Sequence, residues 1–146
     1  MITIKELLKK KTSDIWSISP QASVYQALEL MAQKDVGALL VIENDKLAGI
    51  FSERDYARKV ILKGKASKET AVSELMTKSV YYVTPDNTLE EAMALMTSKH
   101  IRHLPIMNQG RLVNIVTLGD VVKRIISEQK LTIDELENYL TGGYGA

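Results

Sequence analysis

A chain of 146 residues is long enough for one compact domain, and its 45% hydrophobic and 25% charged residues are ordinary for a globular protein with a buried core. Its formal net charge is only +1, which argues against a protein that wraps nucleic acid or binds an anionic membrane through its overall charge. The absence of cysteine excludes disulfides, thiolate catalysis and cysteine-based zinc sites. No apolar run approaches the roughly 18 residues that cross a bilayer, so we expect a cytoplasmic protein without membrane contact.

An internal repeat organises the chain. A shift of 65 residues places Asp55 on Asp120 without a gap, together with many identical or similar pairs ahead of them. Before this stretch, residues 4–8 resemble residues 72–76 at a shift of 68, so the first copy carries three extra residues near its start. Such a repeat indicates a duplicated supersecondary unit. The two copies span about residues 2–62 and 70–127.

The first copy predicts strand, helix, strand, strand and helix in turn. An opening strand at 15–18 ends at the turn Ser19-Pro20, because a residue before proline is pushed out of the helical conformation. Apolar residues from Val24 to Met31 recur at helical spacing, which predicts one core-facing side of a helix. The apolar runs on either side of Glu43–Asp45 predict a β-hairpin, after which a helix begins near Ser52. The second copy repeats this order with a strand at 80–83, a helix over 89–96, a hairpin over 104–116 and a helix from Thr117.

These elements predict a mixed α and β fold of the α+β class, built from two β-α-β-β-α units. One copy of roughly 60 residues buries too little surface to be stable alone, so we expect the two copies to pack as a pseudo-twofold module. A capping box at 132–135 predicts one further helix before a glycine-rich tail. The expected parts are 1–66, the first copy with a short N-terminal helix; 67–127, the second copy; and 128–146, a C-terminal helix with a flexible tail.

One element that can carry chemistry occurs in both copies, where the last strand turns into the last helix. Residues 49–55 and 114–120 each place a hydroxyl, of Ser52 or Thr117, three residues before an aspartate. A hydroxyl at the helix N-cap with an acid at N3 is a capping box, which stabilises a fold by about 1 kcal/mol without any ligand. The same helix N-terminus, with free N–H groups and the positive end of a dipole, can also accept a phosphate, while the acid accepts ribose hydroxyls. Both interpretations can hold together.

Cationic side chains accompany this element in both copies. Several cations close to two helix N-termini suit a phosphate ester. They are Arg54, Arg58 and Lys59 in the first copy, and Arg102, His103, Lys123 and Arg124 in the second.

The signatures Ile18-Ser19-Pro20, Val83-Thr84-Pro85, Arg102–Ile106 and the Gly-h-h-Ser/Thr-x-x-Asp element at 49–55 resemble a tandem pair of cystathionine β-synthase (CBS) domains, also called a Bateman module. The resemblance covers nearly the whole chain. It implies a stand-alone regulatory or sensor protein that binds AMP, ADP, ATP, NAD or S-adenosylmethionine in two clefts between the copies, with AMP first. It also implies a homodimer and a separate, unidentified protein that is regulated.

By this resemblance, Asp55 and Asp120 hold the ribose hydroxyls, while Ser52 and Thr117 hold the phosphate. The two clefts are unlike, because Gly37-Ala38 in the first copy corresponds to Arg102-His103 in the second, and we expect the cleft with Thr117 and Asp120 to be the better site. The residues implied for nucleotide binding are Ser17, Ile18, Gly37, Ala38, Ser52, Arg54, Asp55, Arg58, Tyr82, Val83, Arg102, His103, Pro105, Thr117 and Asp120.

Catalysis has little support in the sequence. None of the common nucleophile, phosphate-loop, zinc or dinucleotide motifs is present, so we expect no enzyme, no catalytic residues and no catalytic cofactor. The two histidines, His100 and His103, can supply at most two ligands of a metal site that needs three or four, so we expect no metal. Trp16 can stack on adenine, although a single tryptophan beside an apolar strand is more often a packing residue.

Two other functions stay open beside nucleotide sensing. One is a ligand-free structural or interaction module that promotes oligomerisation or docks to a partner enzyme. The other, which the low net charge makes less favoured, is nucleic-acid binding through the cationic helix of Arg54, Arg58 and Lys59.

Overall fold

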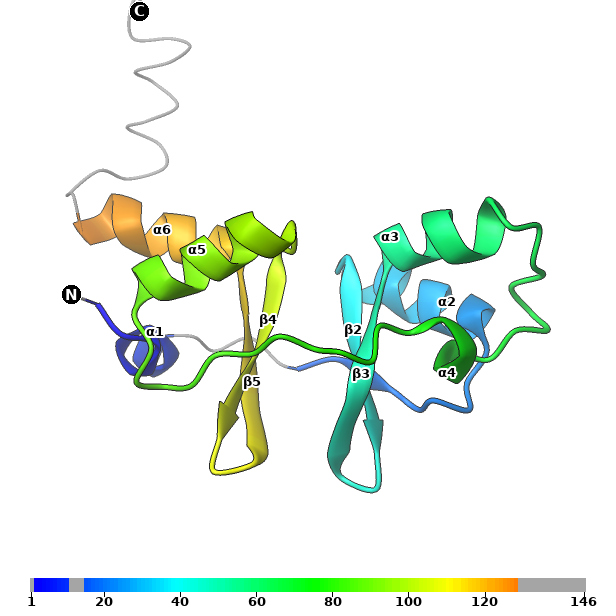
Figure 1. Ribbon diagram of the computed structural model, residues 1–146, viewed down its shortest axis with the longest axis horizontal. Coiled ribbons are helices and arrows are strands. Elements are labelled where there is room, and N and C mark those ends of the chain that lie inside the picture. The colour runs from blue at the N-terminus through cyan, green and yellow to red at the C-terminus, as the bar shows by residue number, and fades with distance from the viewer. Residues whose placement is uncertain (1, 11–14, 129–146) are drawn as a thin grey trace, which may run out of the picture. The chain divides into compact units, whose positions relative to one another are not determined.

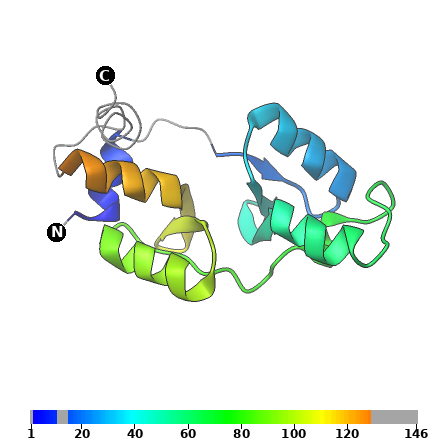
Figure 2. The same ribbon diagram turned by 90° about the horizontal axis from the view of Figure 1, so that it is seen from above.

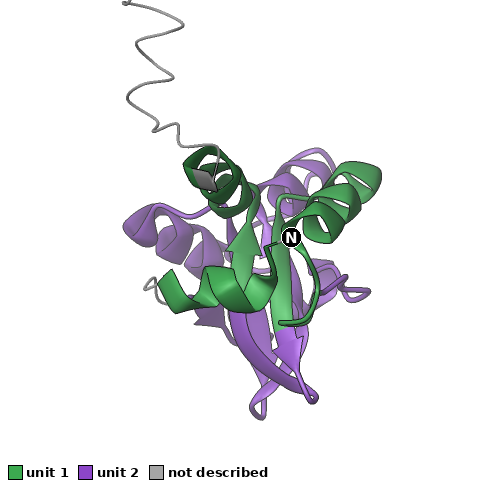
Figure 3. Cartoon of the chain, turned by 90° about the vertical axis from the view of Figure 1, so that its left-hand side faces the viewer, with its two compact units in different colours: residues 1–12, 83–106, 115–146 green, residues 13–82, 107–114 purple. Residues whose placement is uncertain are grey.

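The structure is a computed structural model that describes residues 2–10 and 15–128. The chain divides into two compact units, shown in different colours in Figure 3. One unit contains residues 13–82 and 107–114; the other contains residues 1–12, 83–106 and 115–146. The C-terminal helix and tail expected beyond residue 128 lie outside the described residues.

The first unit contains a three-stranded sheet in the order β1-β2-β3, of which β2 and β3 are labelled in Figure 1. Strand β1 pairs in parallel with β2, which pairs antiparallel with β3. This is the predicted order of elements, although the opening strand is shorter than expected. The elements are β1 (Ser17–Ile18), α2 (Val24–Lys34), β2 (Ala38–Glu43), β3 (Lys46–Ser52), α3 (Glu53–Asp55), the π-helix η1 (Tyr56–Ile61) and α4 (Val72–Leu75).

The second unit repeats the hairpin and its flanking helices. Strands β4 and β5 form a two-stranded sheet, and α5 and α6 lie side by side (Figure 2). The strand expected at 80–83 is reduced to one parallel bridge between Val83 and Ile106. The elements are α1 (Ile4–Lys10), α5 (Leu89–Lys99), β4 (His103–Asn108), β5 (Arg111–Thr117) and α6 (Leu118–Glu128), except that residues 107–114 at the end of the β4-β5 hairpin are grouped with the first unit.

Both hairpins turn through left-handed residues. Asn44 and Asp45 have φ angles of 52° and 63°, and Gln109 and Gly110 have 53° and 77°. Two successive residues with positive φ are what a type I′ turn requires, and its twist matches that of the flanking strands. The predicted hairpins are therefore confirmed.

Helices α2 and α5 begin in the same way, with a capping box. Ser23 and Gln26 satisfy each other's backbone amides at the start of α2, and Thr88 and Glu91 do so at the start of α5. The hydrogen bonds donated by Thr88, first from its backbone amide and then from its hydroxyl, hold the pKa of Glu91 below its ordinary value. These caps locate the two helix starts that the apolar periodicity predicted.

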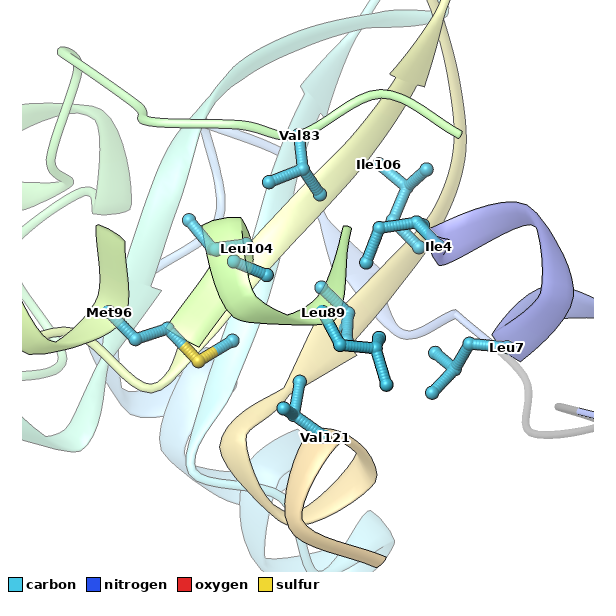
Figure 4. Packing of buried hydrophobic residues seen from close by; sticks show 10 residues of the cluster. Ile4, Leu7, Val83, Leu89, Met96, Leu104, Ile106 and Val121 are labelled. Atoms are coloured by element: carbon cyan, nitrogen blue, oxygen red, sulfur yellow. The ribbon is translucent and has the colours of Figure 1, made fainter. Parts of the chain in front are cut away.

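Each unit has its own apolar core, and the apolar faces of α2 and α5 supply it as predicted. In the first unit, Val24, Ala27 and Met31 pack with residues of β2 and β3 such as Leu39 and Phe51. Figure 4 shows the corresponding cluster in the second unit, where the side chains drawn converge from helices and strands. Its labelled members are Ile4, Leu7, Val83, Leu89, Met96, Leu104, Ile106 and Val121.

The short helix at the N-terminus packs on the second copy. Ile4 is fully buried and belongs to the second unit's core. The amide of Ile4 donates to the carbonyl of Asn87 (2.8 Å), and the amide of Leu89 donates to the carbonyl of Ile2 (3.0 Å).

Helix α4, which precedes the second copy in sequence, makes the equivalent contacts with the first copy. The amide of Val72 donates to the carbonyl of Ala22 (2.8 Å), and the amide of Val24 donates to the carbonyl of Thr70 (2.8 Å). The division expected at residue 66 follows the repeated sequence. The compact units differ from it, because the helix that precedes each copy in sequence belongs to the unit of the other copy.

We expect Ile4→Ala to lower the free energy of unfolding by about 2–5 kcal/mol, because it removes a fully buried side chain from the second core. Urea unfolding of both proteins measures this difference. The control is Lys5→Ala on the exposed side of the same helix, which should change stability by less than about 0.5 kcal/mol. Equal effects of the two changes would show that α1 does not contribute to the core.

Candidate functional site

The repeated hydroxyl–aspartate element lies where β3 passes into α3. We call this place the first junction, comprising residues 49–55 with Gly37 and Ala38. Ala38 pairs with Ser52 across the hairpin, and the amide of Glu53 donates to the carbonyl of Gly37 (3.0 Å). The hairpin thus brings the start of one strand next to the helix that follows the other.

The second junction, residues 114–120 with Arg102 and His103, has the same backbone geometry. The amide of Leu118 donates to the carbonyl of Arg102 (2.9 Å). Because this bond involves only backbone atoms, it does not depend on which side chains stand at the two positions. The structure therefore brings together the predicted residues Arg102, His103, Thr117 and Asp120.

Both junctions are capping boxes. The amides of Ser52 and Thr117 donate to Oδ2 of Asp55 (3.0 Å) and of Asp120 (2.9 Å), and both aspartate amides donate back to the hydroxyls at 3.1 Å. The capping interpretation is confirmed at both places. The ligand interpretation stays a prediction, and it requires a nucleotide to share groups that already stabilise the helix start.

Asp55 also has partners from outside its own turn. The residue is only 8% exposed. Its carboxylate oxygen Oδ1 accepts hydrogen bonds from Thr77 Oγ1 (3.2 Å) and Lys59 Nζ (3.0 Å). Lys59 was among the expected cations, but Thr77 was missed. No local pattern indicated it, because 22 residues separate Thr77 from Asp55.

Thr77 is held there by backbone pairing. Its amide donates to the carbonyl of Ile50 (2.8 Å), and the amide of Ile50 donates to the carbonyl of Thr77 (3.0 Å). Gly49 lets the two segments approach, since a Cβ at that position would lie 2.7 Å from the carbonyl oxygen of Thr77. Gly49 therefore allows the linker to pack against β3 in the first copy. The second copy has Asn114 at the equivalent position.

The remaining predicted residues differ in accessibility. Ser17 and Ile18 pair with Leu40 and Val41, so β1 lies on the side of β2 away from β3. Arg54 and Arg58 are exposed on the helix that starts at the first junction.

In the second copy, Val83 is buried and its amide donates to the carbonyl of the buried Pro105 (3.0 Å), whereas Tyr82 is 57% exposed. Trp16 packs against the first core with Lys34 Nζ 4.3 Å from its ring centroid, as a packing residue does. His100 is an exposed left-handed residue that ends α5.

Neither a metal centre nor a membrane span is found in the described part of the chain. Residues 2–10 and 15–128 contain no group of three or more histidine or acidic side chains placed to hold a metal ion. Within the same ranges, no helix is both long and apolar enough to cross a bilayer.

A model of the CBS domain family matches residues 4–62 and 72–127, which contain both junctions and all the elements around them. The chain belongs to the CBS domain family. Its two matched segments make it a tandem CBS pair, and the α+β fold with two small sheets is that of the CBS repeat. CBS pairs are commonly regulatory and bind adenine-nucleotide-like ligands.

Known CBS proteins are similar to this chain over nearly its full length. A mitochondrial CBS domain-containing protein of Arabidopsis thaliana, CBSX3, is 38% identical over 97% of this chain and 73% of its own length. A solved CBS-domain protein from Burkholderia ambifaria is 46% identical, covers 90% of this chain and 98% of its own, and has a TM-score of 0.84. A hexameric CBS-CP12 protein from bloom-forming cyanobacteria is 26% identical, covers 94% and 82%, and has a TM-score of 0.74.

We expect Gly49→Ala to lower the free energy of unfolding by about 1–3 kcal/mol, because the new methyl group would force the linker carbonyl of Thr77 away from β3. The control is Gly119→Ala at the second junction, where the nearest atom to a new Cβ is Thr117 Oγ1 at 3.7 Å, an ordinary contact. Chemical denaturation of the two variants makes the comparison. A Gly49→Ala protein as stable as Gly119→Ala would contradict this role of the glycine.

Proposed function

We propose that this protein is a regulatory CBS pair that binds an adenine nucleotide at the second junction and passes the signal to a separate protein. The observation that carries the proposal is the set of groups gathered there: the hydroxyl of Thr117, the carboxylate of Asp120 and the cationic side chain of Arg102. Thr117 and Asp120 lie at the start of α6, a helix of 11 residues, and the backbone carbonyl of Arg102 is hydrogen-bonded to Leu118 there. A helix N-terminus of this length favours an anionic group, and arginine suits a phosphate.

Each of these residues has a separate role in the proposal. Asp120 accepts the ribose hydroxyls, Thr117 donates to the phosphate, and Arg102 with His103 neutralises its charge. Asp120 is half-buried, and its Oδ2 accepts the capping hydrogen bond from the amide of Thr117. Tyr82 and the backbone at Val83 are the proposed contacts for the adenine ring and its edge, since the phenol ring is exposed.

We propose AMP as the ligand, and after it NAD, ATP or ADP. Binding of one such nucleotide would report the energy or redox state of the cell. For the Burkholderia relative a role in signal transduction has been suggested, which is in line with a regulatory role here. The ligand-free interaction module is not favoured by the family match. Non-catalytic action and a cytoplasmic location stay predictions, and the Arabidopsis relative is named as mitochondrial.

Isothermal titration with AMP, ATP, NAD and S-adenosylmethionine tests the proposal. We expect one of them to bind, and Asp120→Asn to weaken that binding at least tenfold, about 1.4 kcal/mol, because a neutral amide accepts ribose hydroxyls less strongly than a carboxylate does. Asp45→Asn removes the same charge from the exposed first hairpin turn and should leave the affinity unchanged. The proposal fails if none of the four ligands binds.

We also propose that the chain forms a homodimer through the exposed apolar residues of its last helices. Ile61 and Val122 are 54% and 41% exposed, whereas Val60, which is next to Ile61 in the sequence, is fully buried and cannot contribute to this surface. The hexameric CBS-CP12 relative shows that assembly occurs among similar proteins.

Light scattering on wild type and Val122→Asp tests the dimer. We expect a dimeric wild type and a monomeric variant, because a charge cannot be buried at an apolar contact without a partner. Val113→Asp, at a valine that is 38% exposed on β5, is the matched control and should stay dimeric. A Val122→Asp protein that is still a dimer would contradict the proposed surface.

A further inference from the structure

The carboxylate of Asp55 receives four hydrogen bonds from within the first unit. Oδ2 accepts from the amide and the hydroxyl of Ser52, both at 3.0 Å. Oδ1 accepts from Thr77 Oγ1 (3.2 Å) and Lys59 Nζ (3.0 Å). Two carboxylate oxygens offer about four lone-pair positions in total, so the acceptor capacity of Asp55 is filled.

Two of these donors are themselves fixed by the linker between the repeats. Lys59 Nζ also contacts the carbonyl oxygen of Leu75 (3.2 Å) and Thr77 Oγ1 (3.5 Å). Thr77 is paired with Ile50 through two backbone hydrogen bonds. Asp55, Lys59 and Thr77 therefore form one network that joins the start of α3, the π-helix η1 and the linker.

A ribose diol would have to displace part of this network. Its two hydroxyls need two acceptor positions on the carboxylate, and each position is held by a donor from the chain. Thr77 and Lys59 are accessible to water and could be displaced, but the buried carboxylate would then exchange bonds to the chain for equivalent bonds to the ligand. A ligand hydroxyl that merely replaces an equivalent bond contributes little net affinity.

We propose that Asp55 anchors the inter-repeat linker and does not hold a ribose. Lys59 and Thr77 are responsible, because their hydrogen bonds occupy Oδ1 of the carboxylate. The ribose role implied for Asp55 by its family motif is thereby assigned to Asp120 alone. This inference deepens the proposed function and rests on it for the nucleotide. The anchoring part stands on Asp55, Lys59 and Thr77 without any ligand.

The anchor is tested first without ligand, by hydrogen exchange at the amides of Ile50 and Thr77. Asp55→Asn, Lys59→Met and Thr77→Val should each speed exchange at both amides at least tenfold, because each removes bonds that hold the linker on β3. Asp120→Asn, the same change at the second junction, should leave both amides unaffected. Unchanged exchange in all three first-junction variants would overturn the anchor.

The nucleotide part is tested by titrating the same proteins with whichever of AMP, ATP, NAD and S-adenosylmethionine binds the wild type. We expect one nucleotide per chain, an affinity within threefold of wild type for Asp55→Asn, and at least a tenfold loss for Asp120→Asn. A comparable loss in Asp55→Asn, or a second nucleotide per chain that this variant loses, would overturn the inference.

Two further variants keep the inference testable if Asp55→Asn fails to fold. Lys59→Met and Thr77→Val leave the carboxylate in place, and both should keep the affinity of the wild type. A tenfold loss of affinity in either would overturn the inference, since it would place the first junction in the nucleotide site. If the wild type binds none of the four ligands, the proposed function fails, while hydrogen exchange still decides whether Asp55 is the anchor.

Discussion

The hydrogen bond from the first residue of a helix to the start of the facing hairpin strand is the constraint on which both junctions depend. It joins Glu53 to Gly37 (3.0 Å) and Leu118 to Arg102 (2.9 Å). The bond fixes the turn from strand to helix. It thereby places the hydroxyl and the carboxylate in the positions that form the capping box. Because only backbone atoms take part, the side chains at Gly37 and Arg102 were free to diverge. The duplicated unit can thus keep one geometry while its two junctions acquire different chemistry.

The same motif has different surroundings in the two copies, and the surroundings decide what it can do. In the first copy, the linker supplies Thr77, and η1 supplies Lys59, so that the carboxylate of Asp55 is enclosed by donors of the chain itself. In the second copy, Asp120 is half-buried and starts a regular helix. A carboxylate that is both buried and fully hydrogen-bonded contributes to stability, whereas one that is partly exposed is accessible to a ligand.

The linker is more than a connection between two repeats. Helix α4 is bonded to the first copy through Val72, and Thr77 extends the hairpin of that copy by a backbone pair with Ile50. A few residues later, Val83 enters the sheet of the second unit. The segment between them is therefore one of the covalent connections between the two units. Any signal between the units requires that the ligand bind one arrangement more tightly than another.

Local patterns in the sequence determined much of this protein. The repeat, the helices α2 and α5 with their apolar faces, the two hairpins and the capping boxes all follow from spacing, proline position and residue type, which act over a few residues. The exchange of leading helices, the pairing of Thr77 with Ile50 and the enclosure of Asp55 were decided only by the tertiary structure. These contacts join residues far apart in the chain, and their stability depends on backbone approach and burial, for which the sequence carries no local periodicity. Gly49 is the instructive case: the motif marked the residue, but only the carbonyl of Thr77, 2.7 Å from where a side chain would begin, explains it.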